Sequence, residues 1–189
     1  MRSLGLQLEW PRPAQGNGLG FVSALMAISV LLQVTVIPRV NIGPLEATPN
    51  LVVVMVVAVA MLRGVVVGAV VGFAAGLSVE LMTPGDTLGV LALAYVAIGA
   101  WCGRFASGSE PPSRPFYLII ATGAAGIVPL WMGAVELLRG QGPSLGYLVG
   151  HLTVPHLVFS ILVAWPAWWA ARRLLGAPRE VEPWLVRRA

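Results

Sequence analysis

The feature that most constrains this chain is the apolar run from Leu51 to Met82, whose only charged residues are Arg63 and Glu80. At about 1.5 Å per residue, a continuous helix of this length would exceed a hydrocarbon core of about 30 Å. The run should therefore fold back on itself. Arg63 and Gly64 form the predicted turn between two helices, and the sidedness of the arginines places that turn in the cytoplasm.

The composition extends this interpretation to the whole chain. Of the 189 residues, 57% are hydrophobic and only 11% are charged. A soluble domain of this size could not bury so much apolar surface. We therefore predict an all-α, polytopic membrane helix bundle without a soluble domain, and the apolar runs leave room for about five or six spans.

Six spans divide the chain into three parts. Residues 1–18 form a cytoplasmic N-terminal segment, residues 19–170 the six-helix transmembrane domain, and residues 171–189 a cytoplasmic arginine-rich tail. The first span is longer than the apolar region of a signal peptide and is followed by further spans, so we expect it to be retained. The predicted spans are Leu19 to Ile37, the two halves of Leu51 to Met82, a fourth ending near Phe105, Pro115 to about Leu138, and about Tyr147 to Ala170.

The basic residues favour six spans over five. All twelve are arginines, and cytoplasmic loops of membrane proteins hold most of the basic residues. Six spans place only Arg39 and Arg139 outside, whereas five spans would put Arg63 within the bilayer. Both termini are therefore predicted to be cytoplasmic, and the charge indicates membrane orientation instead of nucleic-acid binding. The ten arginines grouped on the cytoplasmic side are Arg2, Arg12, Arg63, Arg104, Arg114, Arg172, Arg173, Arg179, Arg187 and Arg188.

Tryptophans mark the exit of the last span. Trp165, Trp168 and Trp169 stand just before Arg172 and Arg173. Aromatic rings at headgroup depth followed by cations are typical of a membrane boundary.

Small residues recur at regular spacing in the third predicted span. Gly64, Gly68, Gly72 and Gly76 follow one another every four residues, and Glu80 continues the series. Such spacing lets a second helix approach closely. The groove serves either a contact within the bundle, which we favour, or a docking surface for a partner's helix.

The polar inventory gives no support for an enzyme. The chain has no lysine, and its two histidines, His151 and His156, are five residues apart and point in different directions on a helix. Cys102 lies in an apolar run and is predicted to be a structural thiol. We predict no catalytic set, no metal site and no cofactor.

Two short motifs occur in and before the apolar run. The residues are Pro49, Asn50 and Leu51 at the entry to the second span, then Gly72, Phe73, Gly76, Leu77 and Glu80 in the third span. These two segments resemble the MreD family of rod shape-determining proteins, which has a Pro-Asp-Leu entry and a G-F-x-x-G-L motif followed by an acidic residue. Asn50 and Glu80 stand here where the family usually has Asp.

The resemblance implies a multi-pass protein of the bacterial inner membrane that is not an enzyme. It implies a scaffold of the cell-elongation complex, which partners the single-span protein MreC and links the cytoskeletal filament to the peptidoglycan synthases. The alternative is a substrate-binding subunit of an energy-coupling-factor vitamin transporter. Such a subunit needs a polar or aromatic pocket near the outer surface, and the loops here offer few such groups.

Overall fold

The computed structural model describes residues 18–35, 49–83, 88–107, 113–140, 146 and 154–175. Within them the chain forms six α-helices and one short 3-10 helix and no strand, which confirms the all-helical prediction. Most of the predicted terminal segments and both histidine side chains lie outside the described residues. The elements are α1 (Gly18–Thr35), α2 (Leu51–Arg63), α3 (Val65–Met82), α4 (Val90–Gly103), η3 (Arg104–Ser107), α5 (Arg114–Leu138) and α7 (Val154–Leu175).

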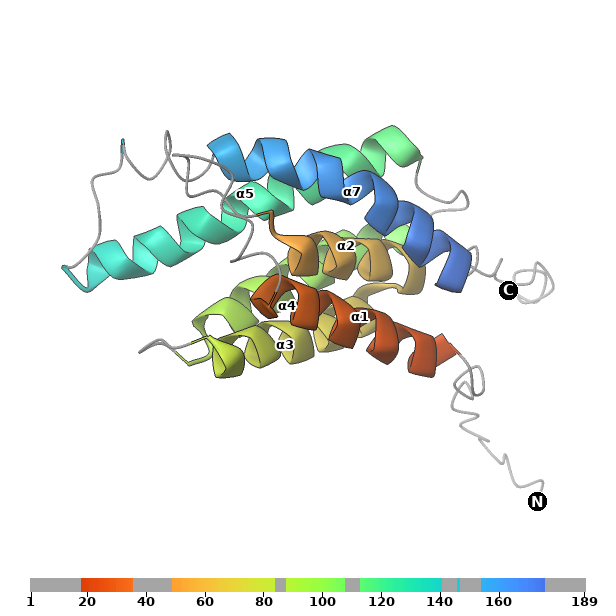
Figure 1. Cartoon of the computed structure of the whole chain (residues 1–189), viewed down its shortest axis with the longest axis horizontal. Coiled ribbons are helices and arrows are strands. Elements are labelled where there is room, and N and C mark those ends of the chain that lie inside the picture. Colours follow the sequence, from red (N-terminus) through yellow and green to blue (C-terminus); the bar gives the residue numbers. More distant parts are fainter. Residues whose placement is uncertain are drawn as a thin grey trace, which may run out of the picture.

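Successive helices alternate in direction. In the view of Figure 1, α1, α3 and α5 run from right to left, and α2, α4 and α7 run back. The first residue of α1 and the last residue of α7 therefore lie at the same end of the bundle.

This alternation gathers charge at one end of the molecule. Arg63 ends α2, Arg104 follows α4, and Arg114 begins α5. Arg172 and Arg173 lie in the last turn of α7, at the same end. We call this end the arginine end; the sixth described arginine, Arg139, lies at the opposite end, just beyond α5.

Helix α2 occupies the centre of the bundle. Every residue from Val52 to Leu62 is buried, and α2 contacts α1, α3, α4, α5 and α7. A helix that is apolar on all sides is expected to be surrounded by other elements. Its many valines have modest helix propensity, so the packing around α2 must stabilise its helical form.

A single glycine separates α2 from α3, at the predicted turn. Gly64 has a φ of +91°, a backbone conformation that residues other than glycine rarely adopt. Its N–H donates to the carbonyl of Ala60 at 2.8 Å, and its carbonyl accepts from the N–H of Gly68 at 2.9 Å. The end of one helix is thus joined directly to the start of the next.

Two boundaries differ from the sequence prediction. Helix α7 continues to Leu175, so Arg172 and Arg173, which were assigned to the tail, belong to its last turn. At the end of α4 the α-helix stops at Gly103 and the chain continues as the 3-10 helix from Arg104.

Two of the described helices, α3 and α5, are long and apolar enough to cross a membrane. Helices α2 and α4 and the described part of α1 are apolar but shorter. Large apolar side chains also face outward on several helices, as Leu93 on α4 and Ile119 on α5 show with exposures of 65% and 71%.

Candidate functional site

The glycine series of α3 packs against the backbone of α4. A Cβ atom added to Gly68 would lie 2.5 Å from the carbonyl oxygen of Gly99, and one added to Gly72 would lie 2.3 Å from that of Tyr95. A Cβ at Gly76 would lie 2.6 Å from the Cα of Ala92. No side chain fits at these three positions, so the close approach is made within this chain.

Helix α4 contributes glycines to the same contact. A Cβ at Gly99 would lie 2.1 Å from the carbonyl oxygen of Gly68, and one at Gly103 would lie 2.5 Å from the Cα of Val65. Facing residue numbers rise along one helix as they fall along the other, as antiparallel helices require. This half of the contact was not predicted from the sequence, although Gly99 and Gly103 have the same four-residue spacing.

The other residues of the predicted groove lie elsewhere. Gly64 forms the link before α3, with nothing within 4 Å of an added Cβ. Phe73 faces outward and is 52% exposed, while Leu77 is half-buried. Of the residues predicted to line the groove, Gly68, Gly72 and Gly76 make the tight contact with α4.

Glu80 caps the start of α4. Its Oε2 accepts a hydrogen bond from the N–H of Gly89 at 2.8 Å, and its Oε1 accepts from the N–H of Leu91 at 2.6 Å. Gly89 is the N-cap residue of α4 and has no side chain to satisfy these donors. A carboxylate at a helix N-terminus also interacts favourably with the helix dipole.

Asn50 joins the start of α2 to α4. Its side-chain oxygen accepts from the N–H of Val53 at 3.2 Å, as an N-cap residue does, and from the hydroxyl of Tyr95 at 3.1 Å. Helix α1 takes part as well, because the side-chain oxygen of Gln33 accepts from the N–H of Leu51 at 2.8 Å. Pro49 immediately precedes Asn50, and its carbonyl accepts from the same N–H of Leu51 at 3.2 Å.

Both predicted motifs therefore meet the same helix. Tyr95 on α4 is 1% exposed; its hydroxyl binds Asn50 and its backbone lies against Gly72. One turn earlier, α4 is capped by Glu80. We call Asn50, Gly72, Glu80 and Tyr95 the α4 junction.

The chemistry of the α4 junction is that of packing and capping. Its polar atoms accept or donate hydrogen bonds that hold helix ends in place. In the described part of the chain, no three side chains among His, Cys, Asp and Glu are grouped so that they could hold a metal ion. Comparisons of the chain with protein-family models, with curated proteins and with solved structures give no match.

Proposed function

We propose that the chain spans the bacterial inner membrane six times, with the arginine end in the cytoplasm. Six helices of alternating direction support this topology, as do the five arginines at one end. The excess of basic residues on the cytoplasmic side is a general property of inner-membrane proteins. Helix α2 is too short to match the bilayer by itself, but it is surrounded by protein and needs no lipid contact.

We further propose that the protein is a non-enzymatic scaffold of the cell-elongation complex. The observation that carries this proposal is the α4 junction, because the two segments on which the resemblance to the MreD family rests pack on one helix. In this role the motif residues fix the shape of the bundle. The partners are then an MreC-like single-span protein and, through it, the peptidoglycan synthases.

Phe73 offers a surface for such a partner. It stands between Gly72 and Gly76 in the motif, yet it faces outward while both glycines face α4. Neighbouring outward side chains on α3 are apolar as well, with Val66 75% and Val70 63% exposed. A partner's apolar span that packs on this face would bury Phe73.

The test is recovery of partners from native membranes in a gentle detergent, identified by mass spectrometry. We expect the tagged chain to retain a single-span protein with an extracytoplasmic domain, together with cell-wall synthases. Phe73→Ala should reduce this recovery. The control is Ile119→Ala, which truncates an apolar side chain on α5 that is 71% exposed, against 52% for Phe73, and should leave recovery unchanged.

Two outcomes would contradict the proposal. Equal recovery with Phe73→Ala and the unaltered chain would show that α3 is not the docking face. Recovery of transport ATPases with a bound vitamin would contradict the scaffold role and support the transporter subunit. The cavity described below lies at the arginine end, whereas a vitamin-binding subunit would need its pocket near the outer surface.

A further inference from the structure

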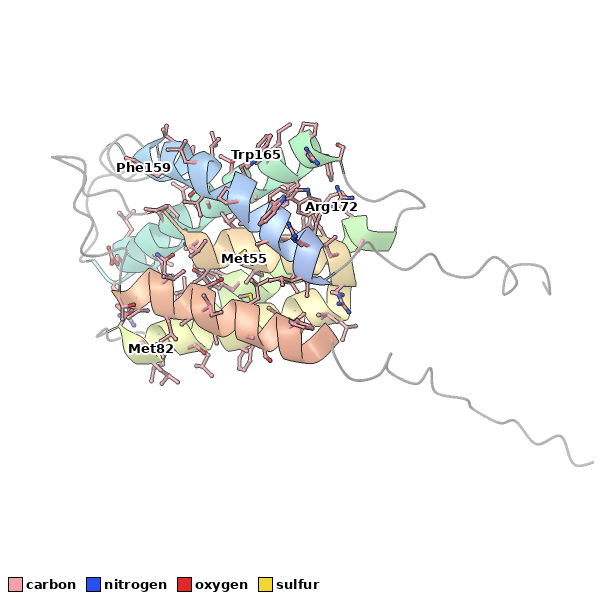
Figure 2. All side chains as sticks on the ribbon, turned by 45° about the vertical axis from the view of Figure 1, so that its right-hand side comes forward. Met55, Met82, Phe159, Trp165 and Arg172 are labelled. Carbon is pink, nitrogen blue, oxygen red and sulfur yellow. The ribbon has the colours of Figure 1, made fainter. Side chains whose placement is uncertain are left out.

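A cavity of about 410 Å³ lies at the arginine end, between the start of α5 and the end of α7. Figure 2 labels Trp165 and Arg172, two of its lining residues, along α7. Its walls combine positive charge with large aromatic surfaces. The lining consists mainly of Arg114, Arg172, Arg173, Trp165, Trp168 and Trp169.

Two of the three arginines of the cavity lie over tryptophan rings. The guanidinium carbon of Arg172 lies 5.6 Å from the ring centre of Trp168, and that of Arg173 lies 5.1 Å from the ring centre of Trp169. Stacking on an aromatic face orients a guanidinium group while its N–H edge stays available to bind an oxyanion.

Among the residues that the structure describes, the lining of the cavity carries three positive charges and no negative charge. The two glutamates whose side chains the structure describes, Glu80 and Glu136, belong to the ends of α3 and α5 that lie opposite. Three like charges around one cavity repel one another, and an anion placed between them relieves that repulsion. The N-terminus of α5 adds to the field, since Arg114 is its first residue and the side chain of Ser113 makes no capping bond.

Trp168, one of the lining residues, also carries a buried hydrogen-bond donor. Trp168 is 4% exposed and stacks on Tyr117 with ring centres 4.3 Å apart. Its indole N–H has no hydrogen-bond acceptor among the described residues. Buried N–H groups are nearly always paired, so an acceptor supplied by a ligand would complete this site.

The exposed tryptophans of the cavity favour a ligand that has both a charged group and an apolar part. Trp165 and Trp169 are 62% and 59% exposed, and exposed indole rings beside cations are typical of headgroup depth. We propose that the cavity binds the phosphate group of an anionic phospholipid. This inference rests on the proposed membrane placement, in which the arginine end meets the cytoplasmic leaflet, where basic pockets between helices bind phosphate headgroups.

The experiment uses the full chain in nanodiscs of phosphatidylcholine with increasing phosphatidylglycerol, and native mass spectrometry counts the bound lipid. The test variant is Arg172→Gln and its control is Arg104→Gln. Arg104 also stacks on a tryptophan at the arginine end, 5.5 Å from the ring centre of Trp101, but neither residue lines the cavity. Loss of one phosphate contact should weaken phosphatidylglycerol binding about fivefold in Arg172→Gln, and binding should be unchanged in Arg104→Gln.

Inorganic phosphate, added to nanodiscs of phosphatidylcholine alone, separates the two sources of the phosphate group. Binding of phosphate that Arg172→Gln abolishes would support the phosphate site and assign it to a soluble ligand. Equal losses in Arg172→Gln and Arg104→Gln would overturn the proposal, since they indicate general attraction to a negative surface. Equal retention of phosphatidylglycerol and phosphatidylcholine would overturn it as well. Neither result bears on the recovery of protein partners, so this proposal and the scaffold fail separately.

Discussion

Gly68 and Gly99 face each other across α3 and α4 so closely that a Cβ on Gly99 would lie 2.1 Å from the carbonyl oxygen of Gly68. The atom it would meet belongs to the backbone, so no side-chain rotation can relieve the clash. The two helices can accommodate a larger residue only by moving apart, and that movement would loosen their contact along its length.

Gly99→Ala should therefore destabilise the bundle by about 1–3 kcal/mol, as overpacking does in tight interiors. The matched control is Gly123→Ala on α5, where nothing lies within 4 Å of an added Cβ. There alanine should be neutral or stabilising by up to about 1 kcal/mol, because it favours the helix. The measurement is the temperature at which the single cysteine, Cys102, which is 3% exposed, begins to react with a maleimide. Shifts of the same sign in both variants would contradict the close contact.

The capping role of Glu80 can be tested at the amides it binds. Glu80→Ala leaves the N–H groups of Gly89 and Leu91 without their acceptor, which should cost about 1–3 kcal/mol. Glu80→Gln keeps one carbonyl oxygen and should fall between the alanine variant and the unaltered chain. Hydrogen exchange should accelerate at the start of α4 in that order. Unchanged exchange at Leu91 in Glu80→Ala would exclude the cap.

The bond between Tyr95 and Asn50 predicts coupled effects of substitution. Tyr95→Phe removes one hydrogen bond and should cost about 0.5–1.5 kcal/mol. Asn50→Ala should cost more, because the same oxygen also caps α2 through the N–H of Val53. In the double variant the losses should be less than additive. A double-mutant cycle on melting temperature measures this, and strict additivity would show that the two residues act independently.

The membrane orientation predicts opposite accessibility for the two ends of α5. In a Cys102→Ala background, a cysteine at Ser113 lies at the arginine end and one at Leu138, which is 89% exposed, lies at the other. A membrane-impermeant maleimide should label Leu138→Cys in intact spheroplasts and Ser113→Cys only after permeabilisation. The reverse pattern would invert the proposed topology.

The sequence predicted the features that depend on local pattern. The apolar run with Arg63 and Gly64 in its middle indicated two helices and a turn, because no single helix of that length fits a bilayer. The spacing of Gly68, Gly72 and Gly76 indicated a close helix contact. The same reasoning applied to Gly99 and Gly103 would have found the other half of that contact.

Other features depend on which helices become neighbours, and the local residue pattern does not reveal which helices these are. Glu80 was seen only as the continuation of the glycine series and as the acidic residue of the motif, and nothing in the sequence around it indicated that it would bind the amide of Leu91. Helices α2 and α3 are similarly apolar, yet only α2 is buried on every side. The tryptophans of α7 were interpreted as a membrane exit, and their cavity appears only once α5 lies beside them.

The central position of α2 has a consequence for how the protein is made. Translation delivers α2 before α3, α4, α5 and α7, so in the proposed membrane it first contacts lipid on the sides that those helices later cover. A polar side chain on any of those sides would be exposed to hydrocarbon until its neighbour arrives. The uniformly apolar sequence of α2 therefore suits the transient intermediates of biogenesis as well as the finished bundle. A polar substitution in α2 would therefore cause poor insertion and degradation of the nascent chain, before any partner could bind.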